Sequence, residues 1–254
     1  MLRDFLAALG FFTRIPIPAR ASHDAAALQR APRYWPLIGL IVGLVAAGVT
    51  ELAARMLPVS LALLLGMVAA ILVTGALHED GLADSADGFG GGWDRARVLA
   101  IMKDSSIGSY GALALALTLL LRYNALLEID AAFEPPTLAL VMIAGHAASR
   151  LAGLIPMALL PYARAEDDAS ARSRPLAAGL GGMALPFAAL CGIAPCGLLP
   201  AADALTALVA AALTGLAATA YFRRRIDGYT GDCLGATQQL SEVAFYLGIA
   251  CSFT

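Results

Sequence analysis

Residues 59–77 read VSLALLLGMVAAILVTGAL, a stretch of 19 residues without one charged side chain. A second stretch of 19 uncharged residues, ALTALVAAALTGLAATAYF, covers residues 204–222. A helix of about 20 apolar residues spans the hydrocarbon core of a bilayer. The whole chain of 254 residues is 59% hydrophobic and only 14% charged, whereas a soluble domain carries about 25% charged residues. This composition excludes disorder and predicts an integral membrane protein.

Seven stretches are apolar enough to be read as membrane spans. Neither an internal repeat nor a low-complexity linker divides the chain, so we expect an all-α, polytopic helical bundle formed by a single domain, residues 1–254. A shorter apolar segment at residues 5–12 predicts a helix that lies in the membrane interface. The pattern Gly39-x-x-x-Gly43 suits close helix packing, including packing in a homo-oligomer. The expected spans are residues 37–56, 59–77, 107–127, 137–160, 183–199, 204–222 and 240–253.

The distribution of basic residues predicts the orientation in the membrane. Of the 17 Lys and Arg residues, 14 fall in the N-terminal segment or in the connections after the second, fourth and sixth spans. Short loops rich in Lys and Arg stay in the cytoplasm. We therefore expect a multi-pass protein of the bacterial inner membrane with its N-terminus and three long connections in the cytoplasm. The 14 basic residues that predict this orientation are Arg3, Arg14, Arg20, Arg30, Arg33, Arg95, Arg97, Lys103, Arg164, Arg172, Arg174, Arg223, Arg224 and Arg225. The net charge of −2 gives no overall basic field for nucleic acid.

An acidic motif, HEDGLADSADGFGGG at residues 78–92, follows the second span. Asp80, Asp84 and Asp87 are spaced four and three apart, which places them on one face of a helix. Such close carboxylates repel one another unless water screens them or a cation binds. Carboxylate oxygens suit Mg²⁺, which keeps water ligands and takes phosphate oxygens as further ligands. The three aspartates are the predicted metal ligands, and the alternative is a solvated acidic helix end. The glycines of the motif, Gly81 among them, favour a site with close backbone approach.

A second cluster, MKDSSIGSYG at residues 102–111, stands before the third span. Lys103 is suited to hold a phosphate as a point charge. Asp104 is a candidate metal ligand or general base. Ser105 and Ser106 are candidates for the same site, or for capping the helix that follows.

A third cluster, DGYTGDCLGA at residues 227–236, lies on the same expected side of the membrane. Asp232 stands directly before an apolar helix and is a candidate for catalysis or, alternatively, for helix capping. Charged residues inside spans are costly and usually functional. For Arg150 we consider both anion binding and an internal ion pair with Glu242. The ionisable residues expected within spans are Glu51, Arg55, Arg122, His146, Arg150 and Glu242.

These clusters favour a Mg²⁺-dependent transferase that acts on phosphate-bearing substrates at the cytoplasmic face of the membrane. A divalent-cation transporter is the non-enzymatic alternative, although the carboxylates gather in connections rather than in mid-membrane. Another alternative is a different membrane phosphotransferase or prenyltransferase. The segment Asp84-x-x-Asp-Gly88 is similar to the start of the CDP-alcohol phosphotransferase motif, but the rest of that motif is missing.

The chain resembles the cobalamin (5′-phosphate) synthases, also called adenosylcobinamide-GDP ribazoletransferases, nearly from end to end. The acidic motif is the most specific part of the resemblance, and the order of the shorter motifs strengthens it. The matching segments are FTRIPIP at 12–18, PLIG at 36–39, residues 78–88, MKDS at 102–105 with Gly108, Ser149-Arg150, Tyr162-Ala-Arg164, and TGDCLGA at 230–236 followed by Glu242.

The resemblance implies the last assembly step of cobalamin. The ribose 3′-hydroxyl of α-ribazole or its 5′-phosphate attacks the phosphorus attached to adenosylcobinamide, and GMP leaves. It further implies Mg²⁺ held by Asp80, Asp84 and Asp87, and a general base that is Asp104 or Asp232. The residues expected to bind substrate are His78, Gly81, Lys103, Arg150 and Arg164, of which the last three would contact phosphate or nucleotide.

Overall fold

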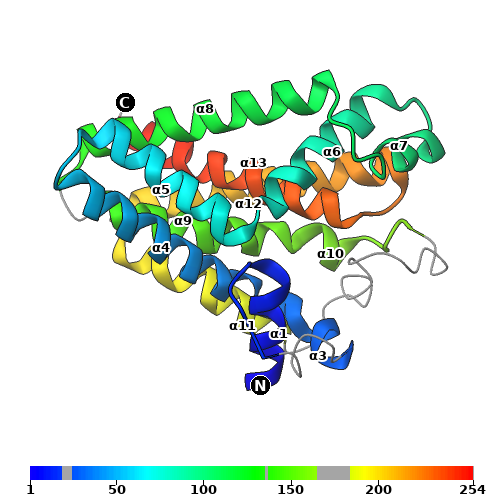
Figure 1. The fold of residues 1–254 in the computed structure, drawn as a ribbon, viewed down its shortest axis with the longest axis horizontal. Helices are drawn as coiled ribbons and strands as arrows, with labels where there is room; N and C mark the ends of the chain where they lie inside the picture. The colour runs from blue at the N-terminus through cyan, green and yellow to red at the C-terminus, as the bar shows by residue number, and fades with distance from the viewer. Residues whose placement is uncertain (19–24, 135–136, 165–183, 254) are drawn as a thin grey trace.

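The computed structural model describes residues 1–18, 25–134, 137–164 and 184–253. In these ranges the named elements are all helices, which confirms the all-α prediction. The long helices form a bundle, and α7 lies at the end opposite the C-terminus (Figure 1). The elements are α1 (Leu2–Phe12), α3 (Ala25–Arg30), η1 (Ala31–Tyr34), α4 (Trp35–Ala54), α5 (Val59–Thr74), α6 (Leu77–Gly91), α7 (Arg95–Ile101), α8 (Ser109–Ala132), α9 (Thr137–Gly153), α10 (Ile155–Leu159), α11 (Ala184–Ile193), η3 (Ala194–Leu198), α12 (Ala201–Ile226), α13 (Gly231–Ala250) and η4 (Cys251–Phe253).

The structure supports a polytopic membrane protein, but it does not confirm the predicted number of seven spans. Among the described residues, four helical stretches are long and apolar enough to cross a membrane, or five if α5 and α6 form one bent span. The four contain α4, α8, α9 with α10, and α12. Helix α11 has only 10 residues. Helix α13 carries Gln238, Gln239 and Glu242 in its middle. The predicted count of seven is therefore not confirmed.

The uncharged run at residues 59–77 does not continue as one helix to its end. Helix α5 ends at Thr74, and both Gly75 (φ 65°) and Ala76 (φ 58°) adopt the left-handed conformation. Glycine accepts this conformation readily, whereas in a residue with a Cβ it costs about 1–2 kcal/mol. The axes of α5 and α6 consequently differ by 86°. The acidic motif that we placed in a connection forms helix α6, which turns away from the apolar arm α5.

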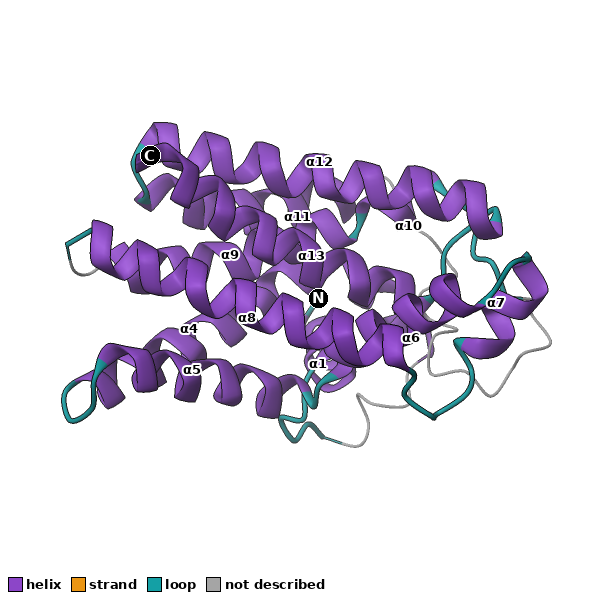
Figure 2. Cartoon of the chain, turned by 90° about the horizontal axis from the view of Figure 1, so that it is seen from above, coloured by secondary structure: helices purple, strands orange, loops and turns teal. Residues whose placement is uncertain are grey.

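Helix α13 is the central element of the bundle. It contacts α6, α8, α9 and α12, and Figure 2 shows it between its neighbours. Fourteen of its 20 residues are buried. Two of these buried residues are glycines, Gly235 and Gly248. Helix α13 contacts α6 at Gly235. An added Cβ on Gly81 of α6 would lie 2.9 Å from the carbonyl oxygen and 3.1 Å from the Cα atom of Asp232. Gly81 of α6 and Gly235 of α13 therefore allow the backbones of these two helices to touch.

The predicted small-residue pattern packs inside the chain. An added Cβ on Gly43 would lie 2.8 Å from the Cα atom of Ile143, and one on Gly39 would collide with the carbonyl oxygen of His146. Both contacts lie on α9, so this face of α4 is covered by α9 of the same chain. It is not an open face for a second copy.

The connections expected to share one side of the membrane lie together. The α6–α7 connection, residues 160–164 after α10 and the α12–α13 connection all lie at the end of the bundle away from the C-terminus (Figures 1 and 2). Of the 14 basic residues used for the orientation, Arg20, Arg172 and Arg174 lie outside the described residues. The α4–α5 turn, which begins at Arg55, lies at the opposite end of the bundle.

The contact between α6 and α13 gives a first prediction. We expect Gly81→Ala to force the two helices apart, because the atoms it meets belong to the backbone of Asp232 and cannot rotate away. Overpacking of this kind costs about 1–3 kcal/mol. The melting temperature of the detergent-purified protein, followed by circular dichroism, should fall.

A matched control is Gly48→Ala on α4, where no heavy atom lies within 4 Å of the added Cβ. Its melting temperature should stay the same or rise slightly, because alanine favours a helix over glycine by about 1 kcal/mol. Equal losses in the two variants would contradict the close crossing.

Candidate active site at the α6–α13 crossing

The acidic face of α6 is formed as the spacing predicted. Asp80 is exposed, Asp84 is half-buried and Asp87 is buried. Gly81, which we had expected to contact substrate, instead contacts the backbone of α13. Its role is to bring the acidic face of α6 beside Asp232.

Asp232 joins the acidic face from the first turn of α13. The N-cap of α13 is Thr230, whose hydroxyl oxygen accepts a hydrogen bond from the amide of Cys233 at 3.2 Å. The capping alternative for Asp232 is therefore wrong. Its carboxylate instead accepts a hydrogen bond from Nη2 of Arg164 at 2.7 Å. It also accepts one from the Thr230 hydroxyl at 3.2 Å.

The carboxylates of this cluster influence one another. Burial and the negative charges of Asp232 and Asp80 together raise the pKa of Asp84 to about 7, against the opposing effect of the Arg164 guanidinium. Burial also raises the pKa of Asp232, against the opposing effect of the Arg164 guanidinium. The site thus concentrates negative charge that a proton or a cation would neutralise.

Asp87 has a structural role that the sequence analysis missed. Its carboxylate accepts hydrogen bonds from the amides of Gly108 at 2.7 Å and Gly111 at 2.9 Å. These are the N-cap and an early residue of α8, so Asp87 caps that helix from another element. The alternative that Ser105 and Ser106 cap this helix is wrong.

The donor set fits a magnesium ion held by few protein ligands. No group of three His, Cys, Asp or Glu side chains within the described ranges is arranged to hold a metal ion. Both oxygens of Asp87 already accept backbone hydrogen bonds. Mg²⁺ is commonly bound by one or two carboxylates, with water and substrate phosphates completing its six ligands. The exposed Asp80 and the half-buried Asp84 suit that mode better than a three-aspartate cage.

A basic pocket adjoins the acidic cluster. It has a volume of about 520 Å³ and is bordered by the cationic side chains of Arg95, Lys103 and Arg164. The predicted phosphate contacts Lys103 and Arg164 thus lie in one cavity. Arg95 was counted for the orientation in the membrane but was not predicted to be part of the site. Because Arg164 also pairs with Asp232, it links the pocket to the acidic cluster.

Asp104 lies in the connection between α7 and α8, close in the chain to this pocket. It is exposed, and its carboxylate accepts a hydrogen bond from the amide of Ser106 at 2.9 Å. That bond lowers the pKa of Asp104. A carboxylate held in its ionised form and turned to its own loop is a weaker candidate for a general base than Asp232.

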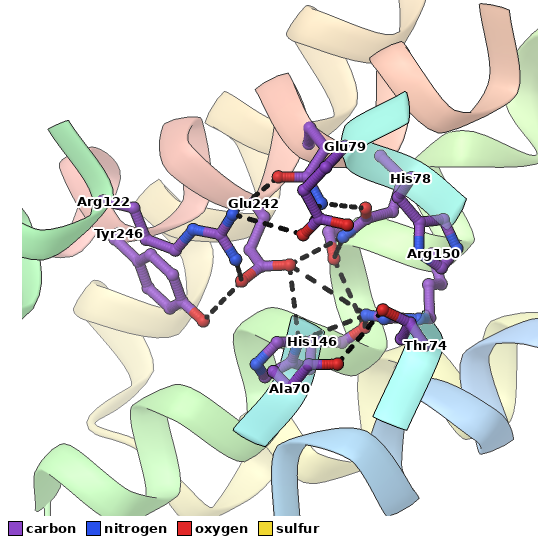
Figure 3. A network of polar contacts seen from close by, with 12 residues as sticks. Ala70, Thr74, His78, Glu79, Arg122, His146, Arg150, Glu242 and Tyr246 are labelled. Carbon is purple, nitrogen blue, oxygen red and sulfur yellow. Dashed lines mark hydrogen bonds and ion pairs between the residues drawn. The ribbon is translucent and has the colours of Figure 1, made fainter. Parts of the chain in front are cut away.

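Inside the bundle, Glu242 is the centre of a buried polar network (Figure 3). Its carboxylate accepts hydrogen bonds from Arg122 at 3.1 Å, from Gln238 at 2.6 Å and from the Tyr246 hydroxyl at 3.3 Å. Nδ1 of His146 lies 3.3 Å from the same carboxylate. All five residues are less than 5% exposed.

The network continues to α6 through Glu79. Oε1 of Glu79 accepts a hydrogen bond from Gln239 at 3.0 Å and lies 3.8 Å from Nη2 of Arg122. The same Nη2 donates to Oε1 of Gln239 at 2.6 Å. Residues of α6, α8 and α13 are thereby joined around a pair of opposite charges.

Arg150 belongs to this network and not to the pocket. It is 2% exposed, and its Nη1 donates to the carbonyl oxygen of His146 at 2.8 Å and lies 4.0 Å from Glu242. The geometry favours the internal pairing over the expected direct contact with substrate. Two arginines face two glutamates here, so the buried charges balance.

His78 is also placed differently from the expectation that it binds substrate. It is 2% exposed, and its Nε2 atom accepts a hydrogen bond from the indole of Trp35 at 3.1 Å. The indole can only donate, so this nitrogen carries no proton and His78 is neutral. Trp35 stacks between His78 and Phe12, which ties the N-terminal helix to the start of α6.

Gln238, Gln239 and Tyr246 belong to the network but were not predicted from the sequence. The sequence could have indicated the two glutamines, because adjacent side-chain amides within an apolar stretch require hydrogen-bond partners when they are buried in a membrane. Trp35 and Arg95 gave no comparable signal, since tryptophan and arginine are common near membrane surfaces.

Comparison with known proteins agrees with the motif resemblance. Residues 4–250 match the family model described as cobalamin-5-phosphate synthase. An adenosylcobinamide-GDP ribazoletransferase of Shewanella frigidimarina (strain NCIMB 400) is 45% identical over 98% of this chain and 94% of its own length. Proteins of the same name from Shewanella pealeana and Shewanella piezotolerans are 44% and 42% identical, each over 97% of this chain and 94% of their own length. No solved structure matches the chain.

The buried network predicts a large cost for removing one of its charges. We expect Glu242→Gln to leave Arg122 and Arg150 facing a single glutamate, because the other carboxylate is gone. Breaking a buried ion pair in this way costs about 3–5 kcal/mol. The melting temperature of the purified protein should fall strongly, whereas the exposed control Glu51→Gln on α4 should leave it unchanged.

A second variant separates charge balance from a simple loss of packing. The double substitution of Glu242→Gln and Arg122→Gln removes one charge of each sign, so its cost should be smaller than the sum of the two single costs. Additive costs would contradict a network held together by paired charges.

The raised pKa of Asp84 predicts a pH dependence of stability in the absence of metal. Between its unfolded value of 3.8 and about 7, the folded protein binds more protons at this carboxyl than the unfolded chain does. Stability therefore falls as the pH rises through this window. In the presence of EDTA, the melting temperature should be higher at about pH 6 than at about pH 8.

The variant Asp84→Asn isolates this contribution. Its melting temperature should depend less on pH than that of the unchanged protein, because the titrating carboxyl is absent. An identical pH dependence in both proteins would show that Asp84 does not titrate in this range.

Proposed function

This chain belongs to the cobalamin-5-phosphate synthase family, and we propose that its transfer reaction takes place where the acidic face of α6 meets Asp232 and the basic pocket. The chain is a transferase of cobalamin biosynthesis that joins adenosylcobinamide-GDP with ribazole. The observation that carries this placement is Arg164, which borders the pocket and donates to Asp232.

The reaction that we assign to this site is a substitution at phosphorus. The 3′-hydroxyl of α-ribazole, or of its 5′-phosphate, forms a bond to the phosphorus that carries adenosylcobinamide. The bond from that phosphorus to the bridging oxygen breaks, and GMP leaves with that oxygen. The hydroxyl proton is released. The products are adenosylcobalamin or its 5′-phosphate, GMP and one proton.

We propose Mg²⁺ as the cofactor, held by Asp80 and Asp84. These carboxylates supply hard oxygen ligands, and Asp80 is exposed to incoming substrate. When bound, Mg²⁺ would neutralise the diphosphate oxygens on which negative charge develops. Asp87, the third expected ligand, supports the site by capping α8 and so fixes the connection that carries Lys103 and Asp104.

The remaining roles are binding of the substrate diphosphate and acceptance of the hydroxyl proton. Lys103 and Arg164 are cations that bind phosphate oxygens, and Arg164 also fixes the orientation of the Asp232 carboxylate. We propose Asp232 as the acceptor of the hydroxyl proton. Its raised pKa makes it a better base near neutral pH than Asp104, whose pKa is lowered.

We propose that this end of the bundle faces the cytoplasm in the bacterial inner membrane. Basic residues lie at this end in α7, in the connection after it, in the segment after α10 and in the last turn of α12. They are Arg95, Arg97, Lys103, Arg164, Arg223, Arg224 and Arg225. The substrates would then reach the site from the cytoplasm, while the apolar helices hold the protein in the bilayer. The charges in the middle of the bundle are paired with one another, so they do not favour a cation pathway.

The activity itself can be tested with one substitution on the acidic face. We expect Asp80→Asn to abolish formation of adenosylcobalamin, or its 5′-phosphate, from adenosylcobinamide-GDP and ribazole in the presence of Mg²⁺. Asp80 is exposed, so the variant should insert and fold like the unchanged protein. Product and released GMP are measured by chromatography after incubation in detergent or liposomes.

The matched control is Glu128→Gln, an exposed carboxylate on α8 in the half of the helix away from the site. It should retain full activity. Near-normal product formation by Asp80→Asn would overturn the assignment of the acidic face. Absence of product with the unchanged protein and all substrates would overturn the proposed reaction.

A further inference from the structure

We propose that the basic pocket beside α7 is a nucleotide subsite, which holds the leaving nucleoside monophosphate and retains it as a product after transfer. This inference rests on the proposed function, because that reaction releases GMP. The inference adds the place where the nucleotide binds and the groups that hold its base and phosphate. It also implies that GMP inhibits the transfer reaction as a product.

The charges of the pocket suit the phosphate of a mononucleotide. Arg95, Lys103 and Arg164 border the same cavity. A nucleoside monophosphate carries close to two negative charges at neutral pH, as other phosphate monoesters do. Arginine and lysine are the usual partners of such a group.

The rest of the wall suits a base. Leu99, Ala96 and Ala100 of α7 contribute apolar surface between the cations. The volume of about 520 Å³ lies within the range of about 300–1,000 Å³ that is typical of small-molecule sites. An apolar wall flanked by cations accepts a flat aromatic base together with its phosphate, which a simple phosphate site would not require.

The walls of the pocket are held in place without a ligand. Arg95 donates to the carbonyl oxygens of Ile226 at 2.8 Å and Ala163 at 2.7 Å, so it ties α7 to the end of α12 and to the opposite wall. The Ala163 amide donates to the carbonyl oxygen of Tyr229 at 2.8 Å. Arg225 closes the end of α6 by donating to the carbonyl oxygen of Gly92 at 2.7 Å. A preformed cavity binds a ligand with less loss of conformational entropy.

The position of Arg164 identifies which phosphate enters the pocket. Its guanidinium pairs with Asp232 and borders the cavity, so an anion in the pocket lies next to the reacting centre. The leaving phosphate is joined to the reacting phosphorus by one oxygen. The 5′-phosphate of an acceptor is separated from its own 3′-hydroxyl by the ribose ring. The geometry therefore points to the leaving nucleotide.

Binding of GMP to the full-length protein in detergent tests this proposal directly. Equilibrium dialysis with radiolabelled GMP should give saturable binding, and GMP should inhibit the transfer reaction in competition with adenosylcobinamide-GDP. We expect Lys103→Gln and the pocket-filling Ala100→Trp each to weaken GMP binding about tenfold or more, which corresponds to about 1.4 kcal/mol. The control Arg97→Gln lies on α7 outside the pocket lining and should bind GMP as the unchanged protein does.

Competition experiments distinguish the possible occupants. GMP should be displaced weakly by inorganic phosphate and by guanosine, because each fills only part of the pocket. If phosphate competes as well as GMP, the pocket is a simple anion site and the proposal is wrong. If α-ribazole 5′-phosphate competes as well as GMP, the pocket belongs to the acceptor and the proposal is also wrong.

The outcome is separable from that of the proposed function. If the unchanged protein forms cobalamin but does not bind GMP, the nucleotide subsite is contradicted and the proposed reaction is not. The same holds if Lys103→Gln and Ala100→Trp bind GMP as tightly as the unchanged protein. A protein that forms no cobalamin from its substrates contradicts the proposed function, whatever its affinity for GMP.

Discussion

The backbone contact of α6 with α13 is the constraint on which the candidate site depends. Gly81 and Gly235 let the two helices approach until Asp232 lies against the turn of α6 that carries Asp80 and Asp84. A side chain at Gly81 would separate acidic groups that come from residues about 150 positions apart in the chain, and one at Gly235 would crowd the backbone of His78. The left-handed turn at Gly75 and Ala76 serves the same end, because it directs α6 away from the apolar arm α5 and across α13.

The buried network explains how such a polar crossing is stable within a membrane protein. Glu79 and Glu242 balance Arg122 and Arg150 in a region where unpaired charge is very costly. The network joins the start of α6 to α8, α9 and α13, so it fixes the helix that carries Asp80 and Asp84. Polar groups in the interior therefore position the helices.

Much of the fold and part of the site could be predicted from the sequence. Apolar runs locate most of the helices, and the spacing of Asp80, Asp84 and Asp87 correctly gives one helical face. What the spacing cannot give is the partner of each side chain. Asp87 caps α8 because a different helix begins beside it, and Arg150 is buried because Glu242 faces it from α13. The predicted number of spans is not confirmed, because α13 carries polar side chains in its middle and α5 ends at Thr74 in a left-handed turn rather than continuing.

The central claim is that Asp80 and Asp84 bind the divalent cation used in transfer. Electron paramagnetic resonance of Mn²⁺, added in place of Mg²⁺ to the purified protein, measures this directly. The claim predicts saturable Mn²⁺ binding that tightens with adenosylcobinamide-GDP, is lost in Asp84→Asn and is retained in Glu128→Gln. Unchanged Mn²⁺ binding in Asp84→Asn, or full transfer activity in the presence of excess chelator, would contradict it.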